Sequence, residues 1–324
     1  MKFDFYAELA ALQESAADSP LPQGLVSGLV DSCTVWNTKG SDQRNEARKS
    51  YMKQAAKNCL RPDLELDRWP PELLHRAWLA FKVEFELLTP WYSKDDRPFH
   101  VLDNPVRKDR VFGVPYMSAA SWKGMLRWAC RVQAGLQKHL EQGRRFEDWR
   151  DRDWILHLFG KEKGEEKKFH QGALVFYPTW FDKIGFEVIN PHDRARRAGT
   201  QPIYYEVVPG RRPNQEGGKG SLRLLYAPWP GMKAAAKPEE VLPHLLEAIE
   251  ALLATYGISA KRTVGWGTAD ITEVAGLWEG QAGATYGNKK GLRKLERPRQ
   301  LPRGSKALGI LLGAEARGRA FIRR

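Results

Sequence analysis

The stretch from Leu102 to Arg131 constrains the fold most, because it joins a polar loop, a Gly-Val-Pro-Tyr turn and an amphipathic helix. Ser118 is suited to be the N-cap of this helix, since its hydroxyl can accept a hydrogen bond from a free N–H of the first turn. At about 100° per residue, one side of the helix is apolar. That side consists of Trp122, Met125, Leu126, Ala129, Val132, Leu136 and Leu140. We predict one helix that buries this side in a core.

The opposite side of the same helix is basic. Lys123, Arg127 and Arg131 follow one another at intervals of four residues, roughly opposite the apolar side. A helix N-terminus carries partial positive charge and unpaired N–H groups, so flanking cations make it a ready phosphate site. The pattern therefore predicts a phosphate-binding face, and a helix face that merely meets water is the alternative.

Composition indicates the class of partner. The 324-residue chain has 52 Lys and Arg against 39 Asp and Glu, a net charge of +13. This excess favours a polyanionic partner, nucleic acid before an anionic membrane surface. The three cysteines lie far apart, so we expect neither a disulfide framework nor a structural zinc site. Without a signal peptide or an apolar run of about 18 residues, we expect a cytoplasmic protein with no membrane span.

The hydrophobic pattern also predicts the remaining elements. We expect strands at 77–88, 172–181, 202–208, 222–226 and 268–274, and a second helix at 239–256. This order is the βαββαβ pattern of ferredoxin-like and RRM-like domains. We therefore predict an α+β fold with a ferredoxin-like or RRM-like βαββαβ core and long loop insertions at residues 75–278. Residues 1–74 are predicted to be a helical N-terminal extension, and residues 279–324 a basic C-terminal tail.

Four stretches, in this order along the chain, resemble the RAMP superfamily, the RRM-like subunits of CRISPR effector complexes. They are GVPYMSAASWKGMLR (113–127), LFGKEKGEEKKFHQGALVFYP (158–178), EVINPHDRARRAGTQPIYYEVVPG (187–210) and AKRTVGWGTADI (260–271). The first is similar to the family signature G-x-P-Y-I-P-G-S-S-L-K-G-x-x-R. Here Ser118 and Ala119 replace the usual Pro-Gly, and Ala120 replaces the first Ser, so the turn into the helix can differ.

The resemblance implies a backbone-type subunit of a type III CRISPR effector complex. Its partners would be guide RNA, target RNA and other effector subunits in a filament-like complex. The candidate RNA-binding residues are Ser118, Ser121, Lys123, Arg127, Arg131, Arg194, Lys261, Arg262, Gly265, Trp266 and Gly267. In the glycine-rich loop, glycines allow close backbone approach and free N–H donors. Trp266 could stack on a base or fill the core. We expect this loop and the Lys123 helix to lie along one groove.

Asp103 is the candidate catalytic residue. In type III backbone subunits that this stretch resembles, an aspartate in the matching loop cuts target RNA with a metal ion. An aspartate is a hard oxygen ligand for Mg²⁺, and the ion can polarise the scissile phosphate. A lone carboxylate is not a complete site, so RNA phosphates would supply further ligands. Arg107 could neutralise the transition-state charge. In the alternative interpretation, Asp103-Asn104-Pro105 is a turn in which Asp103 caps its own backbone.

Two other hypotheses remain open. The first is a non-catalytic capping subunit of the same complex, because the NPHD stretch (190–193) looks like a terminal type III-B subunit. The second is a stand-alone, metal-independent endoribonuclease that processes guide RNA through a histidine such as His100 or His192. Around His192, however, Arg194, Arg196 and Arg197 favour a phosphate-binding loop over acid–base chemistry.

Overall fold

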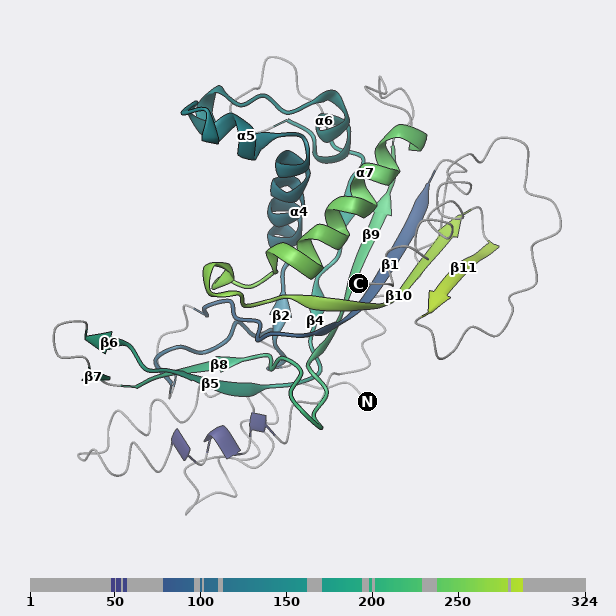
Figure 1. Cartoon of the computed structure of the whole chain (residues 1–324). Coiled ribbons are helices and arrows are strands. Elements are labelled where there is room, and N and C mark those ends of the chain that lie inside the picture. Colours follow the sequence, from purple (N-terminus) through teal and green to yellow (C-terminus); the bar gives the residue numbers. More distant parts are fainter. Residues whose placement is uncertain are drawn as a thin grey trace.

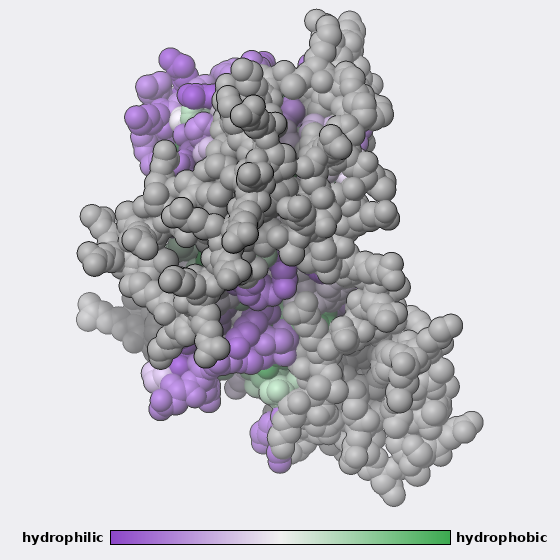
Figure 2. All heavy atoms as spheres, turned by 90° about the vertical axis from the view of Figure 1, so that its right-hand side faces the viewer, coloured by the Kyte–Doolittle hydropathy of each residue, from purple (hydrophilic) through white to green (hydrophobic). Residues whose placement is uncertain are grey.

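The computed structural model of the chain (Figure 1) describes residues 48–49, 51–53, 55–56, 78–95, 100, 102–109, 113–161, 171–193, 198–199, 202–228, 238–278 and 281–287. Most of the predicted N-terminal extension and most of the predicted tail lie outside these residues. Among the helices described, none is long and apolar enough to cross a membrane. The described surface seen from one side is mostly hydrophilic (Figure 2).

A five-stranded antiparallel sheet forms the centre of the fold. In spatial order its strands are β11 (Gln281–Gly287), β10 (Ala269–Trp278), β1 (Leu79–Leu87), β9 (Lys219–Tyr226) and β3 (Leu174–Phe176). Helices α4 (Ala119–Gln133) and α7 (Pro238–Ala251) pack on this sheet (Figure 1). Along the chain, β1, α4, β3, β9, α7 and β10 follow as strand, helix, strand, strand, helix, strand. The predicted mixture of helices and antiparallel strands is confirmed.

Alternation along β1 determines which face of the sheet the helices cover. Phe81, Val83, Phe85 and Leu87 are buried and share one core with apolar side chains of α4 and α7. The Phe85 ring meets the Trp122 ring of α4 edge to face, with centroids 6.1 Å apart. The apolar side of the predicted helix therefore fixes α4 on the sheet.

The prediction of one long helix is wrong at its C-terminal end. Helix α4 ends at Gln133, and Gly135 follows with φ of 108°. A residue in this left-handed region cannot continue a right-handed helix, so α5 (Leu136–Glu141) is a separate element. Leu140, which was assigned to the buried side, is 44 % exposed. Further along, α6 (Asp153–Phe159) adds Ile155, Leu158 and Phe159 to the core.

Two of the predicted strands lie elsewhere than expected. The stretch 172–181 divides into β3 and β4 (Thr179–Trp180), and β4 pairs with β2 (Tyr116–Met117) just before α4. The stretch 202–208 contributes β8 (Ile203–Val207), which pairs with β5 (Gly185–Ile189) in a hairpin outside the main sheet (Figure 1). Strands β6 (His192–Asp193) and β7 (Ala198–Gly199) pair at the far end of this hairpin. Alternation predicts a strand but not its partner, so the sequence pattern misplaced β8.

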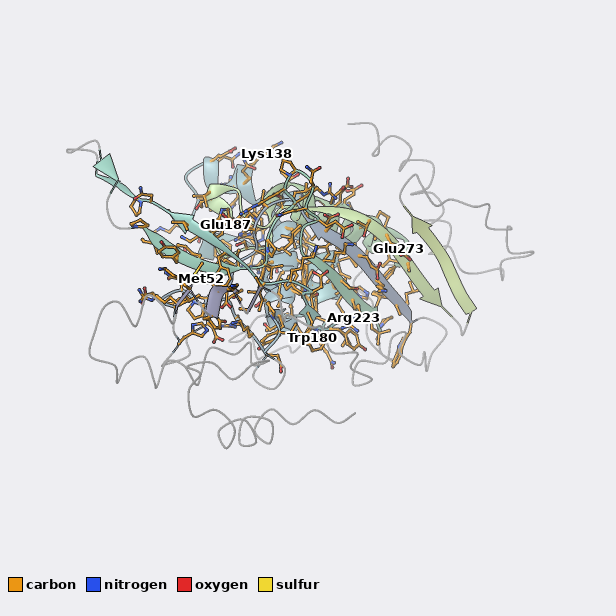
Figure 3. The ribbon with its side chains drawn as sticks, turned by 90° about the horizontal axis from the view of Figure 1, so that it is seen from below. Met52, Lys138, Trp180, Glu187, Arg223 and Glu273 are labelled. Carbon is orange, nitrogen blue, oxygen red and sulfur yellow. The ribbon has the colours of Figure 1, made fainter. Side chains whose placement is uncertain are left out.

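The structure describes residues beyond both ends of the predicted domain at 75–278. Strand β11 pairs with β10, so the sheet extends to Gly287 and the predicted boundary at 278 falls inside a hairpin. At the other end, the described residues between 48 and 56 are helical. Tyr51 and Ala55 of this helical segment pack with Leu102 and Ile184 in a second small core. Figure 3 shows Met52 on the same side of the molecule as Glu187 of β5.

Candidate nucleic-acid interface

The N-terminus of α4 is held rigidly over the sheet. Ser118 is the N-cap, and its hydroxyl accepts a hydrogen bond from the Ser121 N–H at 3.2 Å, as predicted. The Ser118 and Ser121 hydroxyls are 2.9 Å apart. Trp122 is fully buried, and its Nε1 donates to Thr179 Oγ1 at 2.9 Å. The first turn of α4 is therefore a preformed group of polar atoms on a fixed support.

The glycine-rich loop is fastened next to this helix by its backbone. Gly265 and Gly267 have φ of 81° and 88°, which favours glycine at both positions. A Cβ atom at Gly267 would lie 2.3 Å from the Ser259 nitrogen, whereas one at Gly265 would meet nothing within 4 Å. The Ile258 N–H donates to the Gly267 carbonyl at 2.9 Å. Gly267 thus allows the loop to close on itself, and Gly265 supplies only backbone conformation.

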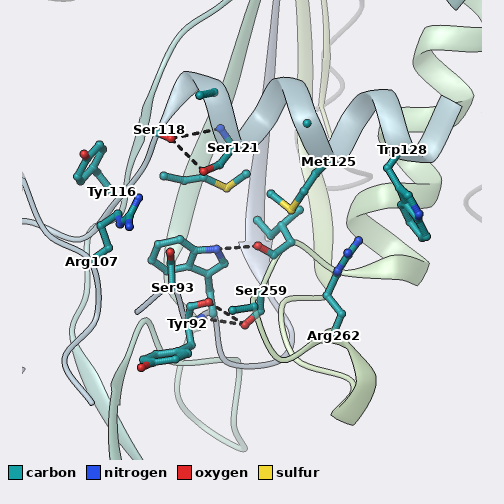
Figure 4. Close-up of a pocket in the computed structure, with 16 residues that line it drawn as sticks. Tyr92, Ser93, Arg107, Tyr116, Ser118, Ser121, Met125, Trp128, Ser259 and Arg262 are labelled. Atoms are coloured by element: carbon teal, nitrogen blue, oxygen red, sulfur yellow. Dashed lines mark hydrogen bonds between the residues drawn. The ribbon is translucent and has the colours of Figure 1, made fainter. Parts of the chain in front are cut away.

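A pocket of about 430 Å³ lies between the start of α4, the glycine-rich loop and the segment after β1 (Figure 4). The residues lining it are Trp91, Tyr92, Ser93, Arg107, Tyr116, Met117, Ser118, Ala120, Ser121, Gly124, Met125, Trp128, Ile258, Ser259, Ala260 and Arg262. This set contains four serines and two arginines but no carboxylate. The rest of the lining is mainly aromatic and apolar, and because its charged groups are both cationic the pocket is suited to a polyanion. Helix and loop therefore face one pocket, although Lys123 itself does not line it.

Arg262 is the most informative cation in this pocket. Its guanidinium lies over the Trp128 ring, 4.7 Å from the centroid, so the side chain is held in place. Its Nη1 atom is buried and has no hydrogen-bond partner within the described part of the chain. A buried donor without a partner is costly unless a ligand or water completes it. The arrangement is suited to a phosphate oxygen.

Trp266 is half-buried and contacts two tyrosine rings. Its ring meets Tyr92 and Tyr205 edge to face, with centroids 6.5 and 5.9 Å away. Tyr205 belongs to β8, so this aromatic group joins the glycine-rich loop to the hairpin. Lys261 lies over the Tyr205 ring at 4.6 Å. These contacts hold the ring in an aromatic group, and its stacking on a base stays a prediction.

The predicted face of three cations is wrong for Arg127 and Arg131. Both form ion pairs with Asp151 at 2.6 Å, and their side chains are only 11 % and 13 % exposed. Burial raises the pKa of the Asp151 carboxyl, but hydrogen bonds from Arg131 and Arg127 outweigh this effect and leave the pKa below its usual value. Of the three, Lys123 is exposed. The connector after α5 brings Asp151 onto the helix, which helical periodicity could not show.

Asp103 is exposed, in a loop beside β8 whose Leu102, Val106 and Lys108 are buried. Asn104 Nδ2 donates to the Tyr204 carbonyl at 3.2 Å, and the Glu206 N–H donates to the Asn104 carbonyl at 3.0 Å. The Asp103 carboxylate itself accepts from Arg48 Nη2 at 3.4 Å. No other partner of this carboxylate is seen in the described chain, so the predicted self-capping turn is not what these contacts show. Arg107, expected to support Asp103, lines the pocket instead (Figure 4).

Behind this loop lies a buried ionic cluster that the sequence did not reveal. Lys108 Nζ is 2.6 Å from Glu206 Oε1, and the two side chains are 1 % and 0 % exposed. The Tyr51 hydroxyl donates to the same oxygen at 2.6 Å. The Val106 N–H donates to Glu206 Oε2 at 3.1 Å. The cluster joins the helical segment 48–56, the Asp103 loop and β8, three segments that are far apart in sequence.

Of the two predicted histidines, His100 is the one whose side chain the structure describes. His100 is buried, and its Nδ1 accepts a hydrogen bond from the Leu102 N–H at 3.0 Å, which removes it from the surface where RNA would bind. His192 and Asp193 form β6. Arg194, with Arg196 and Arg197, lies outside the described residues. Across the described chain, no group of three or more His, Cys, Asp or Glu side chains could hold a metal ion.

No curated protein matches the sequence. Among solved structures, a chain of the type III-B Cmr-beta complex bound to cognate target RNA aligns with a TM-score of 0.55 and 13 % identity, over 85 % of this chain and 98 % of that chain. This likeness shows a shared fold.

Two other solved structures align less well. A chain of a CRISPR RNA-guided surveillance complex, pre-nicking, has a TM-score of 0.42 and 12 % identity, over 62 % of this chain and 75 % of that chain. A chain of the Csm3–Csm4 subcomplex of the type III-A CRISPR-Cas interference complex has a TM-score of 0.36 and 16 % identity, over 63 % and 81 %. The sequence profile of the RAMP superfamily matches residues 84–270, more than half of the chain, and the chain therefore belongs to the RAMP superfamily.

Proposed function

We propose that this protein is an RNA-binding, backbone-type subunit of a type III CRISPR effector complex in the cytoplasm. The observation that carries the proposal is the pocket between α4 and the glycine-rich loop, which lies inside the residues matched by the family. Its serines and arginines offer donors to phosphate oxygens, and its lining residues offer no competing carboxylate. The solved Cmr-beta chain with the same fold comes from a complex bound to target RNA.

Guide RNA is the ligand that we assign to this pocket. Phosphates can accept from the first-turn N–H groups of α4, from the Ser118 and Ser121 hydroxyls, and from the Arg262 guanidinium, which lines the pocket. These donors recognise the backbone and not the base edges, so binding tolerates any guide sequence. Neighbouring subunits in a filament-like complex would extend the same path along the guide.

Target RNA is assigned to the Asp103 loop, where we propose that Asp103 takes part in cutting. The Asp103 side chain is 75 % exposed, so a strand can reach it. The described residues provide no group of three or more metal-ligating side chains here, so the ion would be held jointly by Asp103 and RNA phosphates. When bound, Mg²⁺ would polarise the scissile phosphate.

A second candidate is a non-catalytic capping subunit that binds RNA in the same pocket. The lack of any group of three or more metal-ligating side chains among the described residues favours this candidate. A stand-alone processing endoribonuclease is less well supported, because His100 is buried and hydrogen-bonded to the backbone.

The test is cleavage of target RNA by the reconstituted complex, with wild-type chain and with Asp103→Ala, with and without Mg²⁺. We expect Asp103→Ala to abolish Mg²⁺-dependent cuts while guide binding stays at the wild-type level. Asp109→Ala, a change in the same loop, serves as the control and should cut like wild type. Equal cutting by wild type and Asp103→Ala would leave the capping subunit as the function.

A further inference from the structure

Arg48 is the cation that the fold places beside Asp103. Its Nη2 lies 3.4 and 3.5 Å from the two carboxylate oxygens of Asp103. The two side chains are 36 % and 75 % exposed, so a ligand can reach both. Exposed ion pairs contribute little to stability. This ion pair with Asp103 therefore does little for folding.

The position of Arg48 is fixed by buried contacts of Tyr51 in the same helical segment. Tyr51, one helical turn further along, is buried and donates its hydroxyl to Glu206 Oε1 at 2.6 Å. Glu206 pairs with Lys108, which belongs to the same loop as Asp103. Tyr51 also packs in one apolar cluster with Leu102, the residue next to Asp103. The helix that carries Arg48 is thus attached to the Asp103 loop by a buried polar contact and by an apolar contact.

The charges explain what such an arrangement can bind. A lone exposed carboxylate repels the phosphates of RNA, whereas a guanidinium at its side offsets that charge. Arginine also presents a planar fork of N–H donors that matches phosphate oxygens. The two cations of this loop are engaged elsewhere: Lys108 is paired with Glu206, and Arg107 lines the pocket near Tyr116 (Figure 4).

We propose that Arg48 binds a phosphate group of the target strand next to Asp103. The proposal rests on the proposed function, in that a target strand reaches this loop, but it does not depend on whether Asp103 cuts. In the free protein Arg48 contacts the Asp103 carboxylate, and in the complex it divides its donors between that carboxylate and the phosphate. The N-terminal helical segment thereby contributes directly to recognition of the target.

The experiment measures equilibrium binding of target RNA by the reconstituted complex in EDTA, at a series of monovalent salt concentrations. EDTA prevents cutting, so binding is read without catalysis. The variants are Arg48→Ala, Arg48→Lys and, as matched control, Lys53→Ala, which removes an exposed cation from the same helical segment. Guide RNA binding by each variant confirms that the complex has assembled.

We expect Arg48→Ala to reduce the slope of log K against log salt by about 0.7 to 0.9, the effect of one lost phosphate contact. Arg48→Lys keeps the slope, and Lys53→Ala matches wild type. Asp103→Asn should bind target more tightly than wild type, but not when combined with Arg48→Ala. Equal slopes for Arg48→Ala and Lys53→Ala would overturn the proposal. Unchanged cutting by Asp103→Ala would overturn only the nuclease assignment, and a wild-type complex that binds no target would overturn both.

Discussion

At the scale of single residues, Arg262 carries the sharpest prediction for guide binding. It combines a fixed position over Trp128 with a buried Nη1 that lacks a partner in the described chain. We expect Arg262→Ala to weaken guide RNA binding and to lower the salt slope by about 0.7, because one contact to a single strand is lost. Lys138→Ala, which removes an exposed cation of α5 remote from the pocket, should leave both quantities unchanged. The measurement is a salt titration of guide binding, and equal loss in the two variants would contradict a specific role for Arg262.

At the scale of elements, α4 depends on an acid that lies outside the helix. Asp151 holds Arg127 and Arg131 in a nearly buried cluster. Asp151→Asn leaves two arginines without their counter-charge, so we expect a loss of about 3 kcal/mol in the free energy of unfolding at pH 7. The pKa of Asp151 is lowered in the folded state, so its contribution is present above the ordinary pKa of 3.8 and is lost as the pH falls below it.

The measurement for this element is urea unfolding of wild type and Asp151→Asn between pH 7 and pH 3. The gap in unfolding free energy should be widest at neutral pH and should narrow below pH 3.8. Asp148→Asn, a change at an exposed carboxylate of the same connector, should cost less than about 0.5 kcal/mol. A gap that stays constant down to pH 3 would show that the Asp151 charge does not support α4.

Helices and strands with a regular hydrophobic pattern could be predicted from the sequence. The segments with which they pair or pack could not. Alternation at 77–88 correctly indicated β1, and the Ser118 cap with its apolar side correctly indicated the start of α4. The end of α4 was missed, because Gly135 interrupts a pattern whose apolar residues continue past it. The strand at 202–208 was recognised, but its pairing with β5 outside the main sheet was not, since pairing is decided by contacts between distant segments.

At the scale of the whole molecule, the parts of the pocket that come from short, continuous sequence motifs were predictable. Ser118, Ser121 and Arg262 lie in two motifs that the resemblance placed together, and the structure brings both motifs to one pocket. The surroundings of Asp103 were not predictable. Arg48 is 55 positions away and Glu206 lies on a hairpin, so no period or spacing connects them with that loop. Buried ionic contacts between distant segments are what the sequence alone did not show.

The last prediction concerns the ion pair that joins these segments. Lys108 and Glu206 are fully buried, so Glu206→Leu leaves an ammonium group in the interior without its carboxylate. We expect this change to lower the free energy of unfolding by about 3 to 5 kcal/mol, and we expect Lys108→Met with Glu206→Leu together to cost less than the sum of the two single changes. Urea unfolding of the full chain measures all three variants.

The control for this pair lies on the same hairpin. Glu187 of β5 pairs with Arg212, whose side chain is 53 % exposed, so Glu187→Gln should cost less than about 1 kcal/mol. The buried pair also holds the Asp103 loop and the Arg48 helix in position relative to each other. Glu206→Leu should therefore weaken target binding more than it weakens guide binding. Equal costs for Glu206→Leu and Glu187→Gln would mean that the three segments are held together by apolar contacts and not by this ion pair.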